Sequence, residues 1–114
     1  MPQGSEDNRC FPRIRLQAPL RVQARGSNDF SNTLTNNISL GGLGFSSDRF
    51  IAPNTLLMLQ FNLLSRVLSP LARVAWVNSM PRADKYSCGV EFMEFDNSEK
   101  KYLRDYLDMK SGSL

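Results

Sequence analysis

The chain has 114 residues, of which 41% are hydrophobic and 22% are charged, and these values correspond to one globular domain. No apolar run approaches the ~20 residues of a membrane span, and no apolar signal-peptide segment opens the chain, so we expect neither a span nor export. The sequence contains no histidine, the commonest general base and metal ligand, so an enzyme or a metal site is not expected. Cys10 and Cys88 are too few for a disulfide framework and indicate a reduced, cytoplasmic protein.

The first basic residues of the chain surround a proline. Pro12 disfavours a helix, so we expect Arg9 and Arg13 to lie on an extended N-terminal arm. Residues four apart in an extended chain project to the same side, and two guanidinium groups placed in this way can bracket a compact dianion. Every basic residue before Lys85 is an arginine, the side chain that suits bidentate phosphate contacts.

Alternation of apolar and polar residues predicts a series of short strands separated by turn signals. The strands are expected at residues 20–24, 33–39, 42–47, 55–63, 66–78 and 86–93. Pro70 indicates a bulge or an edge position within the fifth of them. Short strands at this spacing are typical of a small antiparallel barrel or sandwich. We expect one such domain at residues 9–110, between a disordered lead-in at residues 1–8 and a tail at residues 111–114.

The hydrophobic period changes near the end of the chain. Asp96 and Glu99 form a capping signature for a helix N-terminus, and apolar residues then recur at helical spacing as far as Leu107. A glycine at position 112 is typical of the residue that ends a helix. The sequence therefore predicts one amphipathic helix at residues 98–108, with its apolar stripe packed against the sheet.

Residues 36–46 combine amide, hydroxyl and glycine residues between two predicted strands. Asn37 and Ser39 are two residues apart, so in a strand their side chains point to the same face, where they suit the edge of a flat heteroatom ring. The same residue types are typical of a plain hairpin turn. Residues 37–39 also match an N-glycosylation sequon, and residues 42–45 are similar to the carboxylate-binding loop of PDZ domains. These alternatives stay open on the residues alone.

Two separated motifs resemble the paired signature of PilZ domains, which are bacterial receptors for the second messenger cyclic di-GMP. The motifs are Arg9-x-x-x-Arg13 and Asn37-x-Ser39-x-x-Gly42. Their order and separation agree with the family, and residues 72–76, residues 89–92 and the closing helix are also similar to it. The resemblance covers about residues 9–108. One departure is Asn8, at a position where many relatives carry a further arginine.

The resemblance implies a mainly β fold, namely a six-stranded antiparallel β-barrel with one C-terminal α-helix. It also implies a role for each motif residue. Arg9 and Arg13 would contact the phosphates and guanine edges of the ligand. Asn37 and Ser39 would read a guanine, and Gly42 would keep the surface open.

Trp76 is a further candidate for the binding site. It shares its predicted strand face with Ala72 and Val74, so we expect its side chain to be buried in the barrel. The resemblance leaves a second role open, in which the indole lies at the barrel mouth and stacks on a base.

These observations lead to one functional hypothesis and two alternatives. The leading one is a non-catalytic, cytoplasmic cyclic di-GMP receptor in bacterial second-messenger signalling, without a cofactor, whose arginine arm closes over the ligand. The first alternative is a protein-interaction PilZ-like domain that binds no nucleotide, such as a pilus-assembly adaptor. The second is a small barrel that binds single-stranded RNA or DNA, and it is disfavoured because the aromatic residues are predicted to be buried. We therefore expect no DNA or RNA partner, and the sequence names no downstream protein.

Overall fold

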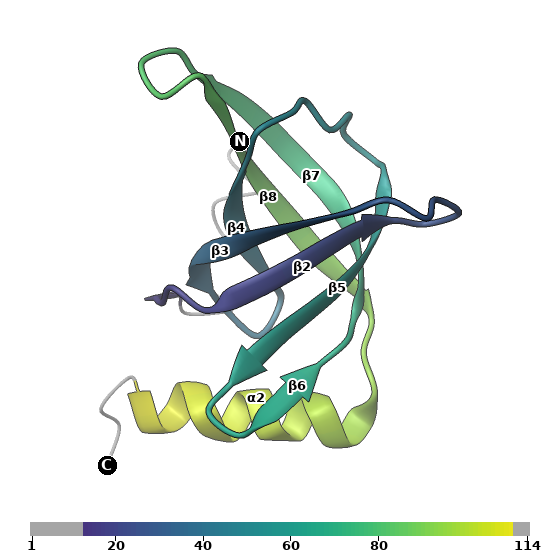
Figure 1. The fold of residues 1–114 in the computed structure, drawn as a ribbon. Coiled ribbons are helices and arrows are strands. Elements are labelled where there is room, and N and C mark those ends of the chain that lie inside the picture. Colours follow the sequence, from purple (N-terminus) through teal and green to yellow (C-terminus); the bar gives the residue numbers. More distant parts are fainter. Residues whose placement is uncertain (1–12, 111–114) are drawn as a thin grey trace, which may run out of the picture.

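A computed structural model describes residues 13–110, which form a closed six-stranded antiparallel β-barrel with one helix beyond it (Figure 1). The strands are β1 (Ile14–Arg15), β2 (Pro19–Ala24), β3 (Phe30–Ile38), β4 (Gly42–Ser47), β5 (Leu56–Leu63), β6 (Arg66–Leu68), β7 (Leu71–Met80) and β8 (Lys85–Glu94), and the helix is α2 (Asn97–Lys110). The mainly β fold class is therefore confirmed. The expected lead-in, Arg9, Cys10 and the expected tail lie outside the described residues.

The barrel strands follow one another in the order β3, β2, β5, β7, β8 and β4, and pairing of β4 with β3 closes the sheet. The two short strands extend this arrangement. β2 pairs with residues 30–34 of β3, and β1 pairs with residues 37–38 at the other end of the same strand. Likewise, β7 pairs with residues 56–58 of β5, and β6 pairs with residues 61–63. Closure leaves no long open edge among the six barrel strands, so their backbone groups are paired within the sheet.

Alternating apolar residues fill the interior of the barrel. In β5 every second residue from Leu57 to Leu63 is buried while the residues between them are exposed. The largest fully buried side chains are Phe45, Phe61, Leu20, Ile38, Leu43, Leu57, Leu59, Leu63, Leu68 and Leu103. Burial of each such side chain contributes roughly 1.5–3 kcal/mol relative to exposure, so this interior is the main source of stability.

The predicted strand at residues 66–78 is two strands in the structure. β6 ends at Leu68, and β7 begins at Leu71. Pro70 lies between them and has no backbone N–H to donate to a ladder, while its carbonyl accepts a hydrogen bond from the Leu59 backbone N–H at 3.1 Å. The proline therefore interrupts the ladder at an otherwise strand-like sequence.

Helix α2 covers the end of the barrel at which β5 and β6 meet (Figure 1). The Asp96 carboxylate accepts hydrogen bonds from the backbone N–H groups of Ser98 (3.1 Å) and Glu99 (3.3 Å). Together with the Ser98 hydroxyl, these donors lower the pKa of Asp96. The helix N-terminus is thus capped as the sequence predicts.

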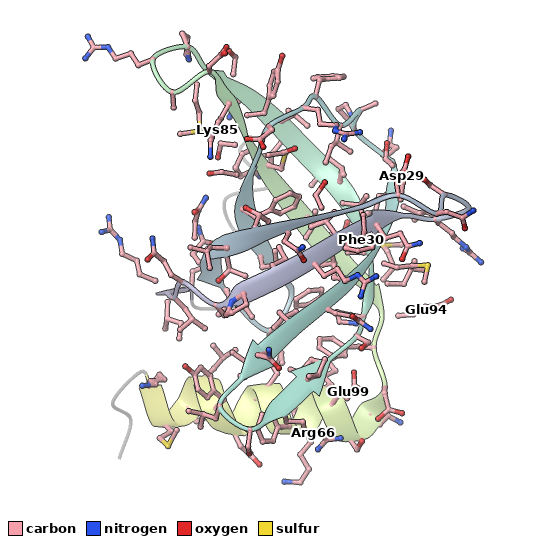
Figure 2. All side chains as sticks on the ribbon, viewed as in Figure 1. Asp29, Phe30, Arg66, Lys85, Glu94 and Glu99 are labelled. Carbon is pink, nitrogen blue, oxygen red and sulfur yellow. The ribbon has the colours of Figure 1, made fainter. Side chains whose placement is uncertain are left out.

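Glu99, which the capping signature pairs with Asp96, has another role in the structure. The Glu99 carboxylate accepts a hydrogen bond from the Ser69 backbone N–H at 2.9 Å, and Arg66 donates to the Ser98 hydroxyl at 3.0 Å. Figure 2 shows Arg66 and Glu99 at this junction of β6 and α2. The Tyr102 hydroxyl also donates to the Leu63 carbonyl at 2.9 Å, so polar contacts as well as apolar packing hold the helix against the barrel. Among residues 13–110, no helix has the length and apolar character needed to cross a membrane.

Candidate functional site

Arg13 and Asn37, one from each predicted motif, lie in direct contact. β1 pairs with β3 so that Arg15 lies opposite Asn37, and this places the preceding residues beside the same stretch of β3. The Arg13 guanidinium donates a hydrogen bond to the Asn37 side-chain oxygen at 2.5 Å. Residues 24 positions apart in the sequence therefore form one cationic and amide-bearing cluster at the surface. Arg9, the other arginine of the motif, lies outside the described residues.

From Asn37, a single row of residues crosses four strands of the barrel. Asn37 on β3 lies opposite Gly44 on β4, Gly44 lies opposite Gly89 on β8, and Gly89 lies opposite Trp76 on β7. Because residues directly opposite one another in a sheet share a face, these four positions share the outer face of the barrel. We call them the glycine row. Its two central positions carry no side chain of their own, and the amide of Asn37 and the indole of Trp76 lie over them.

The two glycines of this row differ in what lies above them. A Cβ atom on Gly89 would lie 2.3 Å from Cε2 of Trp76, which means that the indole rests directly on the β8 backbone. A Cβ atom on Gly44 would lie 3.2 Å from the Asn37 side-chain nitrogen. Any larger residue at position 89 would displace the indole, whereas the space above Gly44 is bounded by a side-chain end that can move.

The predicted burial of Trp76 is wrong, because a β-bulge in β7 changes the face on which it lies. Val74 lies opposite Val90, but the next pair is Trp76 with Gly89, so Ala75 is an extra residue in β7. The bulge turns the Trp76 side chain outward, and 42% of its surface is exposed. Val77 continues the inward-facing series instead and packs against the core.

Ser39 lies in a different setting from Asn37. β3 ends at Ile38, so the alternation that would place Asn37 and Ser39 on one face does not continue to Ser39. The Ser39 side chain is buried, and its hydroxyl accepts hydrogen bonds from the backbone N–H groups of Gly41 and Gly42, each at 3.2 Å. The same hydroxyl donates to the Gly42 carbonyl at 3.2 Å. These contacts hold the turn between β3 and β4, and the structure does not bring this hydroxyl to the glycine row.

Gly42 is also constrained by packing. A Cβ atom at this position would lie only 2.0 Å from the Val90 backbone carbonyl oxygen, because β8 passes very close to the start of β4. The adjacent backbone bond from Phe92 N–H to the Gly41 carbonyl, 2.9 Å long, fixes this approach. Gly42 therefore permits the close contact between two strands that carry the glycine row.

Two further rows lie on either side of the glycine row, and sequence reasoning missed both. On one side Ser46, Ser87 and Asn78 lie opposite one another and offer hydroxyl and amide groups. On the other side Arg73 and Glu91 form an ion pair at 2.6 Å. Strand register, rather than a local motif, brings these residues together, and glycines at positions 42, 44 and 89 were the only signal of a close approach in the sequence.

The face offers binding groups rather than a reactive nucleophile. Cys88 precedes Gly89 in β8 but points into the core, and its burial raises the pKa of the thiol, which keeps it neutral. Within residues 13–110, no three side chains of the metal-binding types lie close enough together to hold an ion. Arginine, amide, hydroxyl and indole groups on one face suit a ligand that is anionic and has a flat ring.

Comparison of the chain with solved structures identifies similar folds at low sequence identity. The inhibitor of motility MotI/DgrA of Bacillus subtilis gives a TM-score of 0.78 at 20% identity, over 89% of this chain and 50% of that one. The PilZ domain of YcgR from Escherichia coli, solved with c-di-GMP, gives 0.66 at 11% identity, over 91% and 97%. The PlzA protein of Borreliella burgdorferi, in complex with c-di-GMP, gives 0.62 at 13% identity, over 91% and 43%.

The chain therefore spans about half the length of MotI/DgrA and less than half that of PlzA. A comparison with curated protein sequences finds no match. The sequence profile of the PilZ domain matches residues 7–109, which is nearly the whole chain. The barrel and the helix that covers one end of it agree with this match, and the chain belongs to the PilZ domain family.

Proposed function

We propose that this chain is a receptor module for cyclic di-GMP and that the ligand binds on the glycine row. The observation that carries the proposal is the hydrogen bond between Arg13 and Asn37, which joins one residue from each half of the family signature at one end of the glycine row. The PilZ domain of YcgR and the PlzA protein, both described with c-di-GMP, have the same fold and support this choice of ligand.

The residues of this face have distinct roles in the proposal. Arg13 supplies a guanidinium group for a phosphate or for the O6 and N7 acceptors of a guanine. Asn37 offers its amide to the base edge, and Trp76, at the other end of the row, presents an exposed ring on which a base can stack. Ser39 and Gly42 act indirectly, because they hold the turn and the strand approach that position Asn37. Arg9 is expected to supply the second cation.

The expected closing arm begins further from the barrel than the sequence suggests. Ile14 and Arg15 already pair with β3 as β1, and Arg13 already contacts Asn37. Closure over the ligand would then involve residues 8–12, which lie outside the described residues, and it stays a prediction. The proposal assigns no catalytic residue and no cofactor, and we expect the module to act in the bacterial cytoplasm.

Isothermal titration calorimetry tests the proposal directly. Two separated phosphate contacts and a base contact require a ligand with two phosphates and a purine, so we expect cyclic di-GMP to bind and GMP or GTP to bind at least tenfold more weakly, a difference of about 1.4 kcal/mol. Arg82→Ala is the control. It removes one arginine from the turn between β7 and β8, away from the glycine row, and should bind cyclic di-GMP as the wild type does. Equal affinity for GMP would refute the proposal.

A further inference from the structure

A second surface, away from the glycine row, runs across the outer face of β3, β2 and β5, where β3 and β5 carry exposed apolar side chains. Register places Phe30 opposite Gln23, Gln23 opposite Met58, Met58 opposite Leu71, and Leu71 opposite Glu94. Phe30, the first residue of β3, and Met58, within β5, are 47% and 48% exposed, values that are high for large apolar side chains. We call these five residues, together with Arg21 and Met93, the β5 patch.

The β5 patch is uneven in shape. Two shallow depressions lie next to each other, one on the patch and one beside it, and Arg21 and Gln60 line both of them. Met58 and Leu71 border the first depression, and Val67, 49% exposed, borders the second. Apolar side chains next to shallow depressions give a surface into which another protein's side chains can pack.

Opposite charges lie toward the two ends of this patch. Arg21 leans toward β3, because its guanidinium carbon lies 3.6 Å from the centre of the Phe30 ring. Glu94 lies at the other end, on β8, where Met93 is an exposed neighbour. Figure 2 shows Phe30 and Glu94 on the same side of the barrel in that view. Neither Arg21 nor Glu94 forms an ion pair within residues 13–110.

We propose that the β5 patch is the interface between two copies of this chain. A two-fold axis that lies in the interface along β5 would place the Arg21 end of one copy over the Glu94 end of its partner, and the reverse contact would form by symmetry. Met58 lies near the middle of the row, so the apolar residues of both copies would pack around the axis. Each copy thereby supplies the counter-charge that the other lacks.

This arrangement favours a second copy over a different protein, because one patch carries both halves of the charge pair. The row spans four strand spacings, about 19 Å, which corresponds to a small interface. We therefore expect a weak and reversible dimer rather than an obligate one. The glycine row is not part of this surface, so the proposal is independent of cyclic di-GMP binding.

Sedimentation velocity of the full chain, at about 10–500 µM and without ligand, tests the proposal. The wild type should shift from monomer to dimer across this range. Arg21→Glu and Glu94→Arg should each raise the dissociation constant at least tenfold, roughly. Each variant places two like charges opposite one another at both of the symmetry-related contacts. The double variant with both exchanges should return to within about threefold of the wild type, since the charge pair is restored in reverse.

Two controls make the result specific. Arg82→Glu makes the same charge change outside the patch and should leave the dissociation constant unchanged, and circular dichroism should show that every variant is folded. If Arg21→Glu fails to fold, Met58→Asp replaces it and should also give a monomer. A wild type that stays monomeric at every concentration would overturn the proposal, as would a dimer that tolerates the single exchanges or a double variant that is not restored.

Discussion

The glycine row and the turn between β3 and β4 contain different halves of one sequence motif. Asn37 is part of the row, is only partly buried and bonds to Arg13. Ser39, two residues later, is buried and bonds only to the turn that it holds. The comparison teaches that residues of a single sequence signature can divide into those that lie on the face proposed to bind the ligand and those that shape the backbone beneath it.

Gly42→Ala should have the largest effect, and on stability. The new Cβ atom would lie 2.0 Å from the Val90 backbone oxygen, which cannot move without disturbing β8, so we expect a loss of at least about 3 kcal/mol or failure to fold. Gly44→Ala is the matched control, because its Cβ atom would meet only the movable Asn37 side chain. Urea denaturation compares the two. Equal losses of stability would show that position 42 is not constrained by strand packing.

Arg13→Ala should have the largest effect on binding. Charge-assisted hydrogen bonds contribute about 1.5–3 kcal/mol each, so the affinity for cyclic di-GMP should fall by roughly 10- to 100-fold. Arg13 is exposed and precedes β1, so the melting temperature without ligand should hardly change. Calorimetry and thermal unfolding of the same samples check both expectations. A large fall in melting temperature would make Arg13 a structural residue and remove the contrast with Ser39.

Ser39→Ala should show the opposite behaviour. It leaves the backbone N–H groups of Gly41 and Gly42 without their side-chain acceptor in a buried turn, which costs about 1–3 kcal/mol of stability. Under conditions where the variant is folded, its affinity for cyclic di-GMP should stay within about threefold of the wild type. This corresponds to a change in binding free energy well under about 1 kcal/mol. A stable variant with much weaker binding would place the hydroxyl on the ligand after all.

Asn37→Ala should have a smaller effect than Arg13→Ala on affinity and a specific effect on base selection. Base contacts specify a ligand whereas phosphate contacts position it, so the preference for cyclic di-GMP over cyclic di-AMP should fall by about tenfold, or roughly 1.4 kcal/mol. Calorimetric titrations of both dinucleotides give this ratio. If the ratio is the same as in the wild type, Asn37 supports Arg13 and does not read the base.

Much of the fold could be predicted from the sequence, because the barrel strands alternate regularly and α2 carries a clear cap at Asp96. The structure brings Arg13 and Asn37, one residue from each motif, into contact, and their role in binding a ligand stays a prediction. The exposed position of Trp76 could not be predicted, since the extra residue at Ala75 reverses the alternation and leaves no mark in the hydrophobic pattern. Burial of the Ser39 hydroxyl depends on where β3 ends, and strand ends are set by tertiary pairing.

The glycine row could not be predicted for a related reason. Gly44, Gly89 and Trp76 come from three strands, and only the register of the closed barrel places them side by side. No local pattern encodes that register, because it follows from how the side chains of all strands fill one interior.

An amide NMR titration of the labelled protein with cyclic di-GMP tests the central claim most directly. If the ligand lies on the glycine row, the largest shifts should occur at Asn37, Gly44 and Gly89 and at the indole N–H of Trp76. The amide of Met58, on the β5 patch, should stay unchanged. Shifts centred on Met58, or an unperturbed Gly89 and Trp76 in a saturated complex, would contradict the account.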